Sequence, residues 1–94
     1  YHERRDFFVR RLNEIGMDCH VPGGAFYAFP DIRKFGLSSQ DFAMGLLESQ
    51  GVAAVPGNAF GPSGEGFLRC CYATAFDQLQ EAADRIEKYV ATLG

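Results

Sequence analysis

Apolar residues recur along the chain with two different periods, which predict helices and strands in turn. The first fifteen residues repeat apolar side chains at helical spacing with charged residues between them, the pattern of an amphipathic helix. The apolar positions are Phe8, Leu12 and Ile15. Gly16 follows as a left-handed terminator, so we expect the helix to end there. Neither a capping residue nor an initiator methionine precedes Tyr1, which leads us to expect a longer parent chain.

A short strand and a second helix are expected next. Residues 25–29 combine aromatic and small apolar side chains between a Pro-Gly-Gly sequence and Pro30, which predicts a turn followed by a buried strand. Ser38 then precedes a run with apolar residues at helical spacing, and Asp41 follows three positions later, as in a capping box. We expect this helix to end at Gly51.

Two further strands and a third helix complete the pattern. The apolar runs at residues 52–55 and 66–73 are predicted strands, and the Gly- and Pro-rich segment 56–66 between them is either a plain connection or a functional loop. Thr74 and Asp77 form a second capping box at the start of the last helix. Its apolar stripe comprises Leu79, Ala83, Ile86, Val90 and Leu93.

The charged residues are expected to lie mainly on solvated helix faces. In the last helix, Glu81 with Arg85 and Asp84 with Lys88 form acid–base pairs at i,i+4 spacing. In the first helix, acids interrupt a run of four arginines, which favours a solvated face over a phosphate site. The arginines are Arg4, Arg5, Arg10 and Arg11.

The predicted fold is α/β, a two-layer α-β sandwich. Helices packed on one face of a small sheet of about three strands bury every apolar stripe. The chain has 94 residues, 47% of them hydrophobic, which suffices for one core and not for two, so residues 1–94 are expected to form one domain. The second face of the sheet then has to be covered by water, by a partner or by a further domain.

Composition narrows the function classes. A net charge of −3 and a pI near 5.2 oppose nucleic-acid binding, which needs a basic surface. The sequence shows no membrane span and no signal peptide, so a cytoplasmic location is expected. The cysteines at 19, 70 and 71 have no metal-ligand spacing and no even framework, so we expect reduced, mostly buried thiols and no metal.

One arginine stands in the middle of an apolar strand. Alternation places Phe67, Arg69 and Cys71 on one face of the run 66–73 and the remaining apolar residues on the other. Because a guanidinium cannot lose its charge, it needs an anion or carbonyl partner if it is buried. Arg69 either pairs with an acid of this domain, lies at a strand end with its head in water, or grips the carboxylate or phosphate of a ligand.

Three motifs stand out along the chain, GGAFYAFPDI (23–32), GVAAVPGNAFG (51–61) and GFLRCCYA (66–73), and an amphipathic helix follows the last of them. Together they resemble the C-terminal small domain of class I and II aminotransferases, the fold type I pyridoxal-phosphate enzymes of the aspartate aminotransferase kind. The resemblance covers nearly the whole chain, and it implies that Arg69 binds the α-carboxylate of the amino-acid substrate. It places Tyr27, Asn58 and Phe60 around the substrate entrance.

The resemblance also implies what other parts of the enzyme supply. The catalytic lysine and most ligands of pyridoxal 5'-phosphate belong to a large domain of the same chain, and neither Lys34 nor Lys88 lies in a fitting motif. This chain is therefore expected to bind no cofactor and to catalyse nothing alone. The full-length enzyme is expected to be a homodimer that functions in amino-acid metabolism, with amino acids and 2-oxo acids as substrates. Relatives with this fold also catalyse lyase reactions.

Two other functions are compatible with the same residues. A stand-alone ferredoxin-like module that binds or senses a small molecule would use Arg69 to hold the carboxylate of an effector. A dimerisation module would need an interior partner for that arginine. Upstream sequence lacking a domain with a Schiff-base lysine would favour the stand-alone module.

Overall fold

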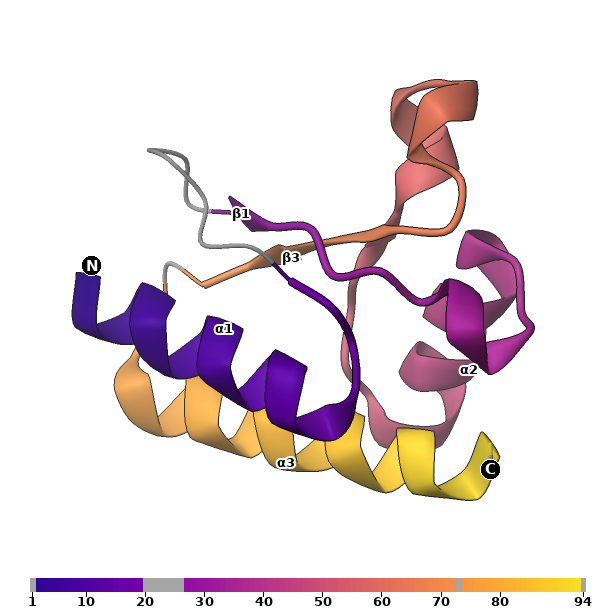
Figure 1. The fold of residues 1–94 in the computed structure, drawn as a ribbon. Coiled ribbons are helices and arrows are strands. Elements are labelled where there is room, and N and C mark those ends of the chain that lie inside the picture. The colour runs from indigo at the N-terminus through magenta and orange to yellow at the C-terminus, as the bar shows by residue number, and fades with distance from the viewer. Residues whose placement is uncertain (1, 20–26, 73, 94) are drawn as a thin grey trace.

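The computed structural model describes residues 2–19, 27–72 and 74–93, apart from the side chains of His2 and Phe60. Within these ranges, helices and strands alternate in the predicted order (Figure 1). They are α1 (His2–Ile15), β1 (Tyr27–Ala28), α2 (Ser39–Gln50), β2 (Val55–Pro56), β3 (Leu68–Cys71) and α3 (Phe76–Leu93). Three 3-10 turns connect them: η1 (Arg33–Phe35), η2 (Gly57–Phe60) and η3 (Pro62–Gly64). None of the helices in this part of the chain is long and apolar enough to cross a membrane.

The sheet has β3 in its centre. Its strand order is β1-β3-β2, and both pairings are antiparallel. Tyr27 is the partner of Cys71 in one pairing, and Val55 is the partner of Arg69 in the other. The prediction of a sheet of about three strands is confirmed, and the strand of the arginine is flanked on both sides.

Two of the strands are shorter than predicted. Of residues 25–29, only Tyr27 and Ala28 form β1, while residues 25 and 26, like the Pro-Gly-Gly sequence before them, lie outside the described residues. Strand β2 begins at Val55, so the prediction of a strand over 52–55 is wrong at three of its four positions. Residues 52–54 do not pair with β3, and a hollow lined by Ala53 and Arg69 lies at this place.

The Gly- and Pro-rich segment forms two 3-10 turns between β2 and β3. Turns η2 and η3 stand beyond the end of β2, away from α1 and α3 (Figure 1). The N–H of Gly57 donates to the carbonyl oxygen of Phe67 at 2.7 Å. Gly57 and Gly64 pack backbone against backbone, so that a Cβ on either would overlap the other. Glycine is needed at both positions for this close approach.

The first predicted helix cap is confirmed and the second is wrong. Ser38 precedes α2, and its hydroxyl oxygen accepts the N–H of Asp41 at 3.1 Å. Gly51 ends the same helix with φ of 70°. Helix α3, however, begins at Phe76, one residue later than a Thr74 cap requires, and the Thr74 hydroxyl donates to the side chain of Gln78 at 2.8 Å.

The core lies between the helices and one face of the sheet. The side chains of Leu68, Cys70 and Tyr72 are buried, whereas Arg69 is half-buried and Cys71 exposed, so the predicted alternation of β3 is confirmed. Their neighbours in the core include Phe8, Leu12, Phe42, Leu46, Leu79 and Ile86. In Figure 1, α1 and α3 run side by side beneath β1 and β3.

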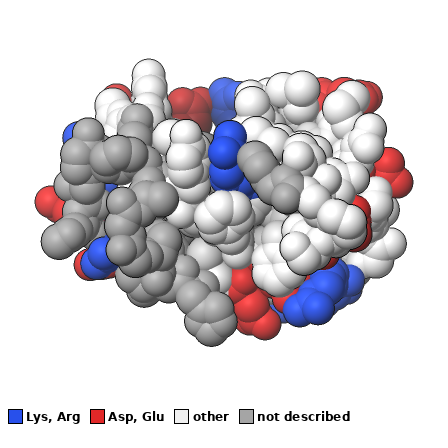
Figure 2. Space-filling model, turned by 90° about the horizontal axis from the view of Figure 1, so that it is seen from above, with Lys and Arg blue, Asp and Glu red and all other residues white. Residues whose placement is uncertain are grey.

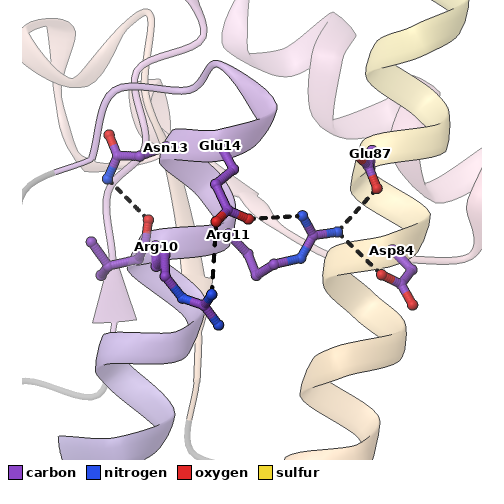
Figure 3. Close-up of polar contacts among 7 residues, drawn as sticks. Arg10, Arg11, Asn13, Glu14, Asp84 and Glu87 are labelled. Carbon is purple, nitrogen blue, oxygen red and sulfur yellow. Dashed lines mark hydrogen bonds and ion pairs between the residues drawn. The ribbon is translucent and has the colours of Figure 1, made fainter.

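Arg11 of α1 forms ion pairs with α3 (Figure 3). The guanidinium of Arg11 donates to Asp84 at 3.1 Å and to Glu87 at 3.0 Å, and its side chain is only 16% exposed. The prediction that Arg11 lies on a solvated face is therefore wrong. Asp84 bonds across the helix pair and not to Lys88 as predicted, while the predicted pair Glu81–Arg85 is confirmed at 2.7 Å.

Candidate functional site

A hollow of about 180 Å³ opens beside the central strand, on the face of the sheet opposite the core. It lies between residues from all three strands and from the segment leading into β2. The lining consists of Tyr27, Ala53, Ala54, Val55, Arg69 and Cys71. Arg69 is the one ionised side chain among these six, because the others are aliphatic, phenolic or thiol groups. A hollow of this composition suits a ligand with one anionic group and an uncharged remainder.

Arg69 and Tyr27 are in direct contact in this hollow. The central guanidinium carbon of Arg69 lies over the Tyr27 ring, 4.3 Å from its centroid. This is within the range of a cation–π interaction. Sequence reasoning selected both residues, and the structure brings them together through the pairing of β1 with β3.

The three thiols differ in their access to solvent. Cys19 and Cys70 are buried free thiols, whereas Cys71 is free and exposed at the edge of the hollow. Burial raises the pKa of Cys19, and burial raises the pKa of Cys70 to about 12. The prediction that the thiols are mostly buried is confirmed, and Cys71 is the exception.

The other two candidate residues are not placed in the hollow. Asn58 is exposed in η2, beyond the end of β2, and does not line the hollow. The side chain of Phe60 lies outside the described residues, so the prediction for it stays a prediction. Sequence reasoning missed the short side chains of Ala53, Ala54 and Val55, which carry no chemical signal and are brought to Arg69 only by the pairing of β2 with β3.

Glu65 is a further residue that sequence reasoning missed. Its carboxylate accepts the N–H of Ser39 at 2.8 Å, the hydroxyl of Ser39 at 3.1 Å and the N–H of Gly66 at 3.0 Å. The bond from the Ser39 backbone is the main cause that holds the pKa of Glu65 below its ordinary value. The three bonds fix the turn that leads into β3, and with it the start of the strand that carries Arg69.

The two lysines of the chain lie away from the hollow of Arg69. Lys34 is exposed in η1 with its Nζ 5.8 Å from the centre of the Phe35 ring, and Lys88 is exposed on α3. Neither lysine lines the hollow of Arg69. Among its described lining residues, the hollow therefore has one guanidinium and no amine.

Charged groups are sparse in the middle of the molecular surface that faces away from α1 and α3 (Figure 2). Figure 2 shows the molecule from above the view of Figure 1, from the side away from α1 and α3. Acidic and basic side chains gather mainly around the rim, and most described atoms in the middle are uncharged.

Known proteins with the same sequence pattern and fold are aminotransferases. The family model Aminotransferase class I and II matches residues 1–86. Aromatic-amino-acid aminotransferase 2 of Thermococcus litoralis is 49% identical over 88 residues, which are 94% of this chain and 23% of that protein. The crystal structure of an aromatic aminotransferase from Pyrococcus horikoshii OT3 superposes with a TM-score of 0.95 at 47% identity, over 98% of this chain and 24% of that one.

A second solved structure contains the cofactor of the family. It is a PLP-bound protein from Clostridium difficile 630, 28% identical, with a TM-score of 0.88 over 95% of this chain and 24% of that chain. The chain thus spans about a quarter of the length of the relatives it matches. The match of the family model over most of its residues shows that this chain belongs to the class I and II aminotransferases.

Proposed function

We propose that the full-length protein is a pyridoxal-phosphate-dependent aminotransferase and that residues 1–94 form its C-terminal small domain. In this domain Arg69 binds the α-carboxylate of the amino-acid substrate and of the 2-oxo-acid product. The observation that carries the proposal is the position of Arg69: on the central strand, against the Tyr27 ring and in a hollow whose other walls are uncharged.

The chemistry of the guanidinium suits this role. A planar fork of N–H donors matches the two oxygens of a carboxylate, and a charge-assisted pair of this kind is stronger than a neutral hydrogen bond. The aliphatic walls of Ala53, Ala54 and Val55 keep water away from one side of the pair. Holding the carboxylate fixes the direction of the Cα–H bond, so the contribution of Arg69 to the rate is positioning.

The rest of the protein has to supply the cofactor site. Pyridoxal phosphate, when bound, supplies the electron sink of transamination. We propose that a large domain of the same chain holds it, since the relatives are about four times as long as this chain. In this arrangement the helices pack on one face of the sheet as a two-layer sandwich, and the uncharged face of Figure 2 meets the large domain.

Replacing Arg69 with Leu in the full-length protein tests this function. A charge-assisted hydrogen bond contributes on the order of 1.5–3 kcal/mol, so loss of a bidentate pair and of orientation should lower kcat/KM for amino acids by roughly two to four powers of ten. Amines without a carboxylate should be much less affected, and the absorbance of bound cofactor should be unchanged. A value of kcat/KM for the best amino acid within a few-fold of the parent would return Arg69 to a structural role.

A further inference from the structure

Tyr27 and Arg69 come together because the register of the sheet places them on one face. Tyr27 is the direct partner of Cys71 across β1 and β3, and Cys71 lies two residues after Arg69 on the same strand. Residues two apart share a face, so the Tyr27 ring is the diagonal neighbour of the Arg69 side chain. The measured contact of 4.3 Å between the guanidinium carbon and the ring centroid agrees with this geometry.

A ring in this position restricts the guanidinium in two ways. It attracts the cation, by about 0.5–2 kcal/mol in general depending on how far the contact is desolvated. It also removes many rotamers of a long side chain, so less rotamer entropy is lost when a ligand orders the guanidinium. With one side of the group against the ring, the N–H donors of Arg69 have to bond in the remaining directions, which include the hollow that both residues line.

Arg33 also lies over an aromatic ring, and it holds a carboxylate of this chain. The guanidinium carbon of Arg33 lies 5.3 Å from the centre of the Phe67 ring. Its Nε and Nη2 donate to the two oxygens of Asp31, at 3.0 Å and 2.6 Å. The Arg33 site shows that a ring contact and a two-pronged carboxylate bond are compatible on one guanidinium in this fold.

We propose that Tyr27 is a positioning residue of the carboxylate site: its ring holds the Arg69 guanidinium in the orientation in which the fork meets the substrate's carboxylate. This inference rests on the proposed function, because it assigns the same ligand to Arg69. The ring carries the effect and the phenol hydroxyl does not. Tyr27 acts through Arg69 and leaves the chemistry of the reacting atoms unchanged.

The decisive comparison is between Tyr27→Phe and Tyr27→Leu in the full-length protein. Tyr27→Leu should raise KM for amino acids about 2- to 30-fold, the range that corresponds to the energy of one cation–π contact, with a much smaller change in kcat. Tyr27→Phe should keep KM within about 2-fold of the parent, because phenylalanine retains the ring face. Phe67→Leu removes the ring that the Arg33 guanidinium contacts and serves as the matched control, with KM unchanged.

A second readout is independent of the cofactor and of turnover. Cys71 is an exposed thiol in the same hollow, and its thiolate displaces iodide from iodoacetate or iodoacetamide, forming the S–C bond as the C–I bond breaks. Iodoacetate carries a carboxylate for Arg69 and iodoacetamide does not. The rates of iodoacetate and iodoacetamide labelling at Cys71 are measured by peptide mass spectrometry. The iodoacetate rate divided by the iodoacetamide rate should fall about 2- to 30-fold in Tyr27→Leu and remain at the parental value in Tyr27→Phe.

The outcomes separate this inference from the proposed function. If Arg69→Leu leaves both KM for amino acids and the alkylation ratio unchanged, the carboxylate site itself is wrong. If Arg69→Leu lowers the ratio while Tyr27→Leu leaves it at the parental value, the site stands and the positioning role of Tyr27 is overturned. A loss in Tyr27→Phe as large as that in Tyr27→Leu also overturns it, because the hydroxyl would then carry the effect.

Discussion

The carboxylate of Glu65 bonds to both the backbone N–H and the hydroxyl of Ser39, which lies 26 residues earlier in the chain. Ser39 is the first residue of α2 and is fully buried, so its N–H is one of the donors that a helix start leaves without an intrahelical partner. The same carboxylate accepts the N–H of Gly66 at 3.0 Å. One side chain therefore joins the start of α2 to the turn before the Arg69 strand.

This contact predicts a loss of stability in acid. The hydrogen bonds hold the pKa of Glu65 below its ordinary value in the folded protein, so the stabilisation is fully present above the unfolded-state pKa and is lost as the pH falls through the folded-state pKa. Glu65→Gln should lower the melting temperature at pH 7 and flatten its decline below pH 5. Thermal melts from pH 3 to 7 measure this, with Glu48→Gln, an exposed carboxylate on α2, as the control. Equal slopes in parent and Glu65→Gln would contradict the prediction.

The bridge from Arg11 to α3 predicts a modest, salt-sensitive contribution to stability. Its partners Asp84 and Glu87 are 66% and 58% exposed, and solvent screens such pairs, so Arg11→Met should cost about 1 kcal/mol. For a domain of this size that is a fall of about 4–8 °C in Tm. Arg10→Met is the matched control, because Arg10 is 63% exposed and its ion pair, with Glu14 at 3.7 Å, stays within α1. An Arg11→Met penalty that does not shrink at about 1 M salt would show that lost packing, and not charge, is responsible.

Local patterns in the sequence predicted the elements of this fold, and contacts between distant residues decided the rest. The alternation along β3 was enough to assign Leu68 to the core and Arg69 to the opposite face. The bond of Glu65 to Ser39 leaves no periodic trace, because a glutamate in a Gly-rich loop is compatible with many partners. The prediction of a strand over 52–55 was wrong at residues 52–54 because β-propensity is a local property. It cannot show where a neighbouring strand diverges and pairing with β3 ends.

In the candidate site too, local sequence pattern identified one residue, and contacts between distant strands decided its neighbours. The apolar setting of Arg69 is visible in the sequence, so its selection needed no structure. Its neighbours in the hollow come from β1 and from the segment before β2, and their approach depends on strand register. Asn58 was selected by resemblance and does not line the hollow. Strand β2 ends at Pro56, and Asn58 belongs to the η2 turn that follows it.

Gly45 in α2 should resist replacement even though glycine is a poor helix former. A methyl group at this position would overlap the hydroxyl of Tyr89, which packs edge-on against Phe42 in the core. Gly45→Ala gains about 1 kcal/mol of helix propensity, and overpacking costs about 1–3 kcal/mol, so the net change should be destabilising. Tyr89→Phe removes the overlapping oxygen, so Gly45→Ala should cost less in that background. A double-mutant cycle by urea unfolding measures the difference, and additive costs would disprove the overlap.

The three thiols should react with neutral alkylating reagents in a fixed order. At pH 8 only about one Cys70 thiol in 10⁴ is ionised, given its pKa of about 12, and both Cys70 and Cys19 are shielded from the reagent. Cys71 should be labelled by iodoacetamide at least about a hundredfold faster than either of them in the folded protein. In urea all three should react at similar rates, which serves as the control. Early labelling of Cys70 under native conditions would show that the core opens locally.

The strictest test of Arg69 is its replacement by lysine, which keeps the charge and changes the geometry. An ammonium group is a mobile point donor, whereas the guanidinium is a planar fork that the Tyr27 ring can hold. If binding needs only a positive charge, Arg69→Lys in the full-length protein should retain most of its activity toward amino acids. If the fork provides orientation, Arg69→Lys should lower kcat/KM by roughly ten- to a hundredfold, less than Arg69→Leu does, since one charge-assisted bond survives.

We expect the second result, together with a loss of sensitivity to Tyr27→Leu in the lysine background, because a lysine there has no guanidinium for the ring to orient. Steady-state kinetics on the two single variants and the double variant decide the matter: if Tyr27→Leu is as harmful with lysine at position 69 as with arginine, the ring acts on something other than the fork.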